Sequence, residues 1–427
     1  MNSKRIEIFP SEISGEIYLS GAKNSALKLQ TATLLTDRKI TITNYPSAML
    51  DIIIQEEMLC CLGKSIVKDH NRIEISGPIT TNQLIWEKRS IRNSLLILGS
   101  LLTRTGAAKV PIPGGCQLGD RKFEIHFELI KAFGGIVWQE ENYLIAKTIQ
   151  GARLKACEFT LPIRSTGATE NAILMAVMAV GKTRIWNPHI RPEIIDLVRF
   201  LNKLGAKIII RGQESIIVEG VEELINEIEY EVLADNMQAI TYLISGGLAA
   251  NELLIKNFPY KDLEVPLIFL KEAGLKYYRH KNEIIVKKCE SYPVDISTGP
   301  YPGINSDMQP LFAAWGCLSR GTSIITDLRF VGRYGYAEEM RKLGVNSSIQ
   351  NNRLIINGSE RLLGAEVNAI DLRAGAALMT LSLIAENSTI INDFWMIERG
   401  YNDVLNVLAS INVRYNILEK TDSDQNI

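Results

Sequence analysis

The sequence predicts an α/β fold made of two domains, each containing three copies of one repeated unit. The chain has 427 residues. A single hydrophobic core of ordinary size does not stabilise so long a chain, so two domains of roughly 200 residues are expected. Helix-like segments also close on glycine or asparagine every 68 to 71 residues, at positions 63, 134, 205, 274, 344 and 412. Such regular spacing indicates six repeats, three in each domain.

Each repeat begins with a short β-branched segment that leads into a helix. In the third copy, Lys182–Asn187 has the composition of a strand. Val198–Leu204 then shows the apolar i, i+3, i+4 spacing of a packed helix, and Gly205 suits its left-handed cap. Short strands complete a βαβαββ unit. A solenoid of stacked repeats is the alternative, but a unit of about 70 residues exceeds the usual solenoid period.

A second class of helices is apolar on nearly every side. These helices are expected at Asn24–Leu35, Arg92–Leu102 and Asn171–Val180. Because they lack a polar face, we expect them to be buried at the domain centres, with the sheets outside. The expected fold class is therefore α/β, with two inverse α/β barrel-like domains and one large cleft between them.

The composition excludes several classes of function. Hydrophobic residues make up 46% and charged residues 22% of the chain, and the net charge is −1, so no general field attracts nucleic acid or an anionic membrane. No transmembrane segment or secretory signal is recognisable. The six cysteines lack disulfide-like spacing and the four histidines are scattered. These features predict a cytoplasmic protein without a metal site.

The second copy of the repeat is altered. Its strand region, Val110–Arg121, contains two prolines, three glycines, Cys116 and Arg121. Prolines and consecutive glycines predict a loop that allows close approach of a ligand. A cysteine there, near an arginine, could have a lowered pKa and act as a nucleophile or an acid. The alternative is an incidental loop cysteine.

Two segments at helix starts suit anions. Lys23 follows a strand and opens a helix, where backbone N–H groups and the positive helix end favour phosphate or carboxylate. Ser165, Thr166 and Gly167 stand at the start of the matching helix in the third copy, where they would cap the helix or bind phosphate. A solvated lysine and a simple helix cap are the alternatives.

Arginines recur where loops should face the cleft. Guanidinium groups bind phosphate and carboxylate at two points, so several of them suit a small, multiply charged anion. Asp307 and Asp371 lie at strand-to-helix junctions, where each is a candidate general base or helix cap. The arginines are Arg92, Arg121, Arg333, Arg373 and Arg399.

Five short motifs together resemble those of the UDP-N-acetylglucosamine enolpyruvyl transferase family. The resemblance covers essentially the whole chain and keeps the order of the motifs. The Gly-Asn-Ala-Gly-Thr-Ala motif of the sister family, which acts on shikimate 3-phosphate, is absent. The matching segments are Gly21–Asn24, Pro113–Cys116, Asp307–Gln309, Asp371–Ala374 and Arg399–Tyr401.

The resemblance implies a reaction and a domain arrangement. The enolpyruvyl group of phosphoenolpyruvate would pass to the 3-hydroxyl of UDP-N-acetylglucosamine with release of phosphate, in peptidoglycan precursor synthesis. One domain would span residues 22–232, and the other would combine 1–21 with 233–427. No cofactor and no metal are implied. The partners would be small-molecule substrates, not nucleic acid or membrane, and the protein would be a monomer or weak homo-oligomer.

The resemblance also assigns roles to residues. Cys116 would take part in proton transfer and product release and would be the target of fosfomycin, and Asp307 would lie next to the attacking hydroxyl. Lys23 would be catalytic and would bind phosphoenolpyruvate together with four arginines, Arg92, Arg121, Arg373 and Arg399. The remaining substrate-binding residues would be Asn24, Ser165, Thr166, Gly167, Arg333 and Asp371.

Four residues depart from the family pattern. Lys122 stands where the family has proline, Arg191 where it has glutamate, Asn236 where it has arginine and Val331 where it has glutamate. These departures concern the acceptor side, so one alternative is an enolpyruvyl transferase with another nucleotide or sugar-nucleotide acceptor. A catalytically silent regulatory paralogue is a second alternative. The joint presence of Lys23, Cys116 and Arg399 argues against it.

Overall fold

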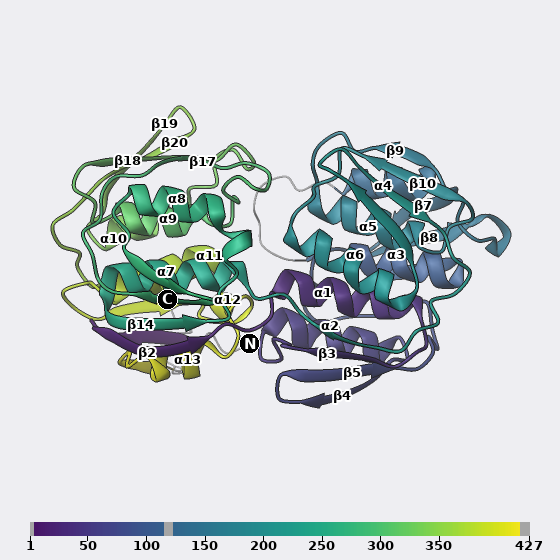
Figure 1. The fold of residues 1–427 in the computed structure, drawn as a ribbon, viewed down its shortest axis with the longest axis horizontal. Helices are drawn as coiled ribbons and strands as arrows, with labels where there is room; N and C mark the ends of the chain where they lie inside the picture. The colour runs from purple at the N-terminus through teal and green to yellow at the C-terminus, as the bar shows by residue number, and fades with distance from the viewer. Residues whose placement is uncertain (1–3, 115–122, 419–427) are drawn as a thin grey trace. The chain divides into compact units, whose positions relative to one another are not determined.

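The computed structural model describes residues 4–114 and 123–418 (Figure 1). They form two compact units, each with its own sheets and helices. Strands and helices alternate along both units, which confirms the predicted α/β class. Unit 1 contains the N-terminal residues up to Ser20, Ala48–Leu50 and the residues from Ala234 on, and unit 2 contains Gly21–Ser47 and Asp51–Leu233.

The predicted βαβαββ repeat is complete in the last part of unit 2. A parallel pair of strands flanks an inner helix, and a second helix leads to an antiparallel hairpin in the same sheet. The sheet order is β11-β12-β10-β9. The elements are β9 (Glu158–Thr160), α5 (Thr166–Ala176), β10 (Lys182–Trp186), α6 (Pro192–Leu204), β11 (Lys207–Arg211) and β12 (Ser215–Glu219).

The first two repeats of unit 2 follow this order with one change each. In the first, the parallel partner of β3 is β13, from the end of the unit. In the second, one parallel bridge between Gln83 and Lys109 replaces the first strand. The elements are α1 (Lys23–Ala32), η1 (Thr33–Leu35), β3 (Ile40–Thr43), α2 (Leu50–Cys61), β4 (Ser65–Asp69), β5 (Arg72–Ser76), α3 (Ser94–Thr105), β6 (Ala107–Pro111), α4 (Glu124–Ala132), β7 (Gly135–Glu140), β8 (Tyr143–Thr148), η2 (Ile149–Gly151) and β13 (Ile228–Glu231).

Unit 1 contains the pattern three times, with sheet orders β15-β16-β14-β2, β17-β18-β20-β19 and β21-β22-β1-β23. In the last sheet, the N-terminal strand β1 lies between β22 and β23. The elements are β1 (Arg5–Ile8), β2 (Ile13–Tyr18), α7 (Asn236–Ala249), β14 (Ala250–Lys256), η3 (Tyr260–Asp262), α8 (Glu264–Glu272), β15 (Tyr277–His280), β16 (Glu283–Val286), β17 (Asp295–Ser297), α9 (Gln309–Gly316), β18 (Thr322–Thr326), α10 (Tyr336–Lys342), β19 (Asn346–Gln350), β20 (Arg353–Asn357), β21 (Glu366–Asn368), α11 (Leu372–Ser382), β22 (Thr389–Asn392), α12 (Trp395–Glu398), α13 (Val404–Ser410) and β23 (Tyr415–Leu418).

The strands next to the unit boundaries are exchanged. β2 precedes α1 in the sequence but pairs in parallel with β14 of unit 1. β13 precedes α7 but pairs in parallel with β3 of unit 2. Each unit is therefore completed by a strand from a distant part of the sequence.

The inner helices are buried, as their apolar composition predicts. Every residue of α7, α9 and α11 is buried, and these three helices pack together in unit 1 (Figure 1). In unit 2, α3 packs against both α1 and α5. The outer helix α6 has one apolar side instead: Leu201 and Leu204 are buried while Lys203 is exposed. In the part of the chain that the structure describes, no helix is long and apolar enough to cross a membrane.

Two expected boundaries are wrong. The inner helix with the apolar stretch Asn171–Val180 begins at Thr166, where the cap expected at Ser165–Gly167 places it, but it ends at Ala176, before the apolar stretch does. The altered segment was expected to be a loop from Val110 on, but β6 continues to Pro111. A proline is tolerated there because it ends the strand.

The residues expected to end the outer helices all have the left-handed backbone. Their φ angles lie between +64° and +111°. This conformation suits glycine and asparagine and lets the chain turn from the helix into the next strand. The prediction is confirmed at Gly63, Gly134, Gly205, Gly274, Gly344 and Asn412.

Candidate active site

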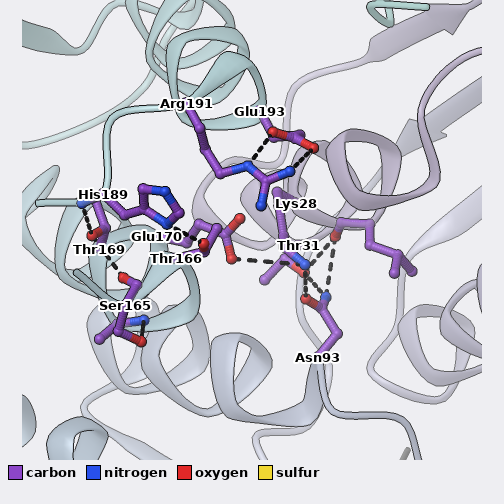
Figure 2. Close-up of polar contacts among 12 residues, drawn as sticks. Lys28, Thr31, Asn93, Ser165, Thr166, Thr169, Glu170, His189, Arg191 and Glu193 are labelled. Carbon is purple, nitrogen blue, oxygen red and sulfur yellow. Dashed lines mark hydrogen bonds and ion pairs between the residues drawn. The ribbon is translucent and has the colours of Figure 1, made fainter. Parts of the chain in front are cut away.

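The predicted site residues of unit 2 lie at the N-terminal ends of its inner helices. Lys23 is the first residue of α1, Ser165 is the N-cap of α5, and Arg92 directly precedes Asn93, the N-cap of α3. Unpaired backbone N–H groups and the helix dipole make such ends favourable for anions. Lys28, in the second turn of α1, contacts both Asn93 and Glu170, in the second turn of α5, so the N-terminal halves of these three helices lie close together (Figure 2).

Lys23 is held by a carboxylate. Its Nζ lies 3.2 Å from Oδ2 of Asp51, in the first turn of α2. Both side chains are buried. The ion pair compensates part of the cost of burying the ammonium group and orients it. Asn24, the next residue of α1, is half-buried.

The segment Ser165–Gly167 opens α5. The hydroxyl of Ser165 accepts a hydrogen bond from the N–H of Ala168 at 3.4 Å, which confirms its capping role. Thr166 Oγ1 lies 2.8 Å from Nδ1 of His189. Gly167 lies against the ring of His126, since a Cβ there would come within 3.6 Å of it. Phosphate binding by this segment stays a prediction.

His126 is neutral and lies near Arg92. Burial, followed by the charge of Arg92, lowers the pKa of His126 to about 3. Its Nδ1 lies 3.0 Å from Nδ2 of Asn171 on α5. The histidine thus connects α4 to α5 without adding a positive charge beside Arg92.

The cysteine loop is described only up to Gly114. Cys116, Arg121 and Lys122 lie outside the described residues. A Cβ at Gly114 would lie 2.1 Å from the carbonyl oxygen of Ser90, so only glycine fits there. The start of the loop therefore packs against the segment that leads to Arg92.

In unit 1, Arg333 joins two predicted carboxylates. Its Nη1 donates to Oδ1 of Asp307 at 2.8 Å and to Oγ of Ser306 at 3.1 Å. Its Nη2 lies 3.5 Å from Oδ2 of Asp371. Burial alone would lower the pKa of Arg333, but Asp307 and Asp371 raise it above its ordinary value. The side chain of Asp307 remains 28% exposed, whereas that of Arg333 is buried.

Asp371 and Arg373 occupy the start of α11. Asp371 Oδ1 accepts from the N–H groups of Arg373 at 2.7 Å and Ala374 at 2.9 Å, so the helix-cap interpretation is confirmed. Nε and Nη1 of Arg373 are buried and have no hydrogen-bond partner in the part of the chain that the structure describes. Burial alone would lower the pKa of Arg373, but Tyr401 and Asp307 raise it. A buried guanidinium with unused donors is suited to binding an anion.

Arg399 follows α12 and is also buried. One of its contacts is from Nη1 to the sulfur of Met396, at 3.6 Å. At the next residue, Gly400, a Cβ would lie 2.3 Å from Leu372 and 3.4 Å from Nη1 of Arg373. Gly400 therefore lets the Arg399 segment pack directly on the start of α11.

Asp327 was missed as a site residue. Its buried carboxylate accepts from Thr298 Oγ1 at 2.8 Å and from Ser306 Oγ at 2.5 Å. It also accepts from the N–H groups of Arg329 and Phe330. It thus joins the loop before Arg333 to the segment before α9. In the sequence, Asp327 shows only as the residue that ends a repeat strand.

One hollow of unit 2 is lined by none of these residues. Its volume is about 480 Å³, and it is lined by Thr160, Arg164, Trp186, Asn187, Gln213 and Glu214. We give it no role, because none of the predicted site residues lines it. Among residues 4–114 and 123–418, no group of three His, Cys, Asp or Glu side chains is placed to hold a metal ion.

Comparison with known proteins identifies the family. The sequence matches the EPSP synthase (3-phosphoshikimate 1-carboxyvinyltransferase) family over residues 9–408. The chain belongs to this family. It is 36% identical over 405 residues to the UDP-N-acetylglucosamine 1-carboxyvinyltransferase of Fervidobacterium nodosum, covering 94% of this chain and 95% of that protein. A Caldanaerobacter subterraneus enzyme, UDP-N-acetylglucosamine 1-carboxyvinyltransferase 1, is 35% identical over 391 residues, covering 91% and 93%. The prediction of an enolpyruvyl transferase is confirmed.

Solved structures share the fold of this transferase. The enolpyruvyl transferase NikO from Streptomyces tendae aligns with a TM-score of 0.89 at 22% identity, over 99% of this chain and all of that one. An EPSP synthase from Acinetobacter baumannii aligns with a TM-score of 0.70 at 14% identity, over 97% and 100%. The predicted two-domain α/β fold of enolpyruvyl transferases is confirmed.

Proposed function

We propose that the transferase moves the enolpyruvyl group of phosphoenolpyruvate to the 3-hydroxyl of UDP-N-acetylglucosamine in the cytoplasm. The Asp307 carboxylate carries the proposal: it precedes a helix, remains partly exposed and is held by the buried Arg333. A carboxylate so placed can take the proton of an attacking hydroxyl. The relatives at 35–36% identity are named for this acceptor. The same proposal includes two domains, one of residues 22–232 and one of residues 1–21 plus 233–427. It also includes a monomer or weak homo-oligomer.

The reaction divides into addition and elimination. A proton adds to the methylene carbon of phosphoenolpyruvate, the acceptor oxygen bonds to the adjacent carbon, and the hydroxyl proton passes to Asp307. The bond from this carbon to the phosphate oxygen then breaks, and a proton leaves the methyl group to restore the double bond. Positive groups stabilise the phosphate and carboxylate in both steps. These groups are Lys23, Arg92, Arg121, Arg373 and Arg399, and Cys116 is assigned to proton transfer.

The acceptor site includes one observed departure that favours a second candidate. Arg191, where the resembling family has glutamate, pairs with Glu193 through Nε at 2.6 Å and Nη2 at 2.7 Å. The family pattern has one arginine and two glutamates in this segment, whereas here Ile190 precedes an ion pair without net charge. The segment thus loses one net negative charge, and this change favours a more anionic acceptor. Asn236 is buried at the start of α7 and Val331 is 81% exposed. The second candidate is transfer to another nucleotide or sugar nucleotide.

Release of phosphate tests both candidates. The protein is mixed with phosphoenolpyruvate and, separately, UDP-N-acetylglucosamine, UDP-glucose, UDP and UMP, and inorganic phosphate is measured. We expect the fastest release with UDP-N-acetylglucosamine. Faster phosphate release with another nucleotide would show that this nucleotide, and not UDP-N-acetylglucosamine, is the acceptor. No release with any of them would contradict a nucleotide or sugar-nucleotide acceptor.

A further inference from the structure

A buried polar cluster connects three inner helices of unit 2 (Figure 2). Lys28 on α1 places its Nζ 3.0 Å from Oδ1 of Asn93 and 3.7 Å from Oε2 of Glu170 on α5. The side chains of Lys28 and Glu170 are 13% and 3% exposed. The charges of Arg191 and Glu193, at the start of α6, also act on the carboxylate of Glu170. Lys28 is therefore the cation that joins α1 to both α3 and α5.

Asn93 is used for tertiary contacts instead of capping. It is the N-cap residue of α3, yet its side chain makes no capping hydrogen bond. Its Nδ2 donates to Thr31 Oγ1 at 2.7 Å and to the carbonyl of Leu27 at 3.2 Å, and it also contacts Gln55 Oε1. With Lys28 on Oδ1, the amide has partners on both ends. The start of α3 is thus fixed to α1 and α2 by one side chain.

We propose that Lys28 is a positioning residue for Arg92. Arg92 shares a peptide bond with Asn93, so the contacts that fix Asn93 also fix the backbone from which the Arg92 side chain extends. Displacement of such a group by about 1 Å costs up to about a hundredfold in rate. The inference rests on the proposed role of Arg92 in binding phosphoenolpyruvate. It adds that a lysine packed between the inner helices, outside the set of groups assigned to that anion, determines how well the anion is bound.

The test compares two buried lysines. Lys28→Met should raise the KM for phosphoenolpyruvate about tenfold or more and change the KM for the acceptor less than twofold. Lys64→Met is the matched control: Lys64 is buried in the same unit, and its Nζ donates to the carbonyls of Thr36 at 2.6 Å and Gly77 at 2.7 Å. It should lower Tm while leaving both KM values unchanged. Lys28→Arg keeps the positive charge, so its KM for phosphoenolpyruvate should lie between those of wild type and Lys28→Met.

A second variant covers the case in which Lys28→Met does not fold. Asn93→Ala keeps Lys28 but removes the contact between Lys28 and the start of α3. This variant should show the same selective rise in the KM for phosphoenolpyruvate. An equal rise of both KM values, or an unchanged phosphoenolpyruvate KM in the folded variants, overturns the inference. Calorimetric titration with phosphoenolpyruvate, with and without nucleotide, separates this failure from that of the proposed function. If wild type binds phosphoenolpyruvate but turns over none of the acceptors, the proposed function fails and the dissociation constant still reports on Lys28.

Discussion

Burial sets the charge of two residues beside the start of α5. Burial raises the pKa of Glu170 to about 7, although Lys28 opposes this shift. Burial, followed by Arg92, lowers the pKa of His126 to about 3. His126 therefore stays neutral at neutral pH, whereas Glu170 changes charge there. Stability should therefore fall as pH rises from 4.5 to 7, where only the native state holds a proton on Glu170, and the His126 contribution should be lost as pH falls below 6.5, where the unfolded chain protonates this histidine.

Glu170→Gln should change how stability depends on pH. The pKa of Glu170 is about 7 in the fold, against 4.5 for an ordinary glutamate, so its contribution to stability is greatest below pH 4.5 and is lost as pH rises through 7. Glutamine carries no charge, so the variant should gain about 1–3 kcal/mol over wild type at pH 8 and much less at pH 5. Urea unfolding at both pH values measures the difference. An equal difference at pH 5 and 8 would show that Glu170 ionises normally.

Lys23→Ala and Arg399→Ala should each weaken phosphoenolpyruvate use severely. Both side chains are buried, and loss of one charged contact in a closed site should cost about 2–4 kcal/mol of transition-state stabilisation. Steady-state kinetics at saturating acceptor give this value from kcat/KM. Arg361→Ala, at a side chain that is 75% exposed, is the control and should behave as wild type. Turnover like wild type in both test variants would contradict the assigned anion site.

At the scale of elements, the sequence predicts the repeat better than the strand pairing. Glycine and asparagine caps mark the helix ends because only a left-handed residue fits there, as at Gly205 and Asn412. The start of α5 follows from the cap at Ser165, but its end does not, because Val177–Ala179 stay buried after the helix has ended and so extend the apolar stretch. The exchange of β2 and β13 leaves no local signal, because both strands precede an inner helix in the same way.

Gly114→Ala should disturb the start of the cysteine loop. The added Cβ would meet the carbonyl oxygen of Ser90 at 2.1 Å, so Ser90 or the loop must move, and Arg92 lies two residues beyond Ser90. We expect kcat/KM to fall about tenfold or more. Gly134→Ala is the control: its φ is +83° but nothing lies within 4 Å of the new Cβ, so it should cost about 1 kcal/mol of stability and no activity. Equal kcat/KM in the two variants would count against the loop contact.

At the scale of the whole molecule, the motifs predicted the reaction class, and the structure added the contacts that hold them. Arg333 and Arg373 are expected in loops that face the cleft and Asp371 at a strand-to-helix junction. The Asp371 cap is local and can be expected from the sequence, whereas the ion pair of Arg333 with Asp371 joins residues far apart in sequence. Asp327 was missed because its partners come from three segments. Such tertiary contacts have no periodicity to detect. The choice of acceptor depends on many such contacts, so measuring the binding of candidate acceptors is the direct way to identify it.

UDP-N-acetylglucosamine should stabilise the protein against heat more than other nucleotides do. A ligand that binds only the native state at about a hundred times its Kd adds about 2.7 kcal/mol to the free energy of unfolding, so Tm should rise with ligand concentration. UDP-glucose, which lacks the acetamido group, and UMP, which lacks the sugar and one phosphate, serve as matched ligands and should shift Tm less. Subsequent addition of phosphoenolpyruvate should release phosphate only when a true acceptor is bound. If UDP, which carries more negative charge than UDP-N-acetylglucosamine, raises Tm further and supports faster phosphate release, the Arg191–Glu193 pair marks a changed acceptor and the sugar nucleotide is not the substrate.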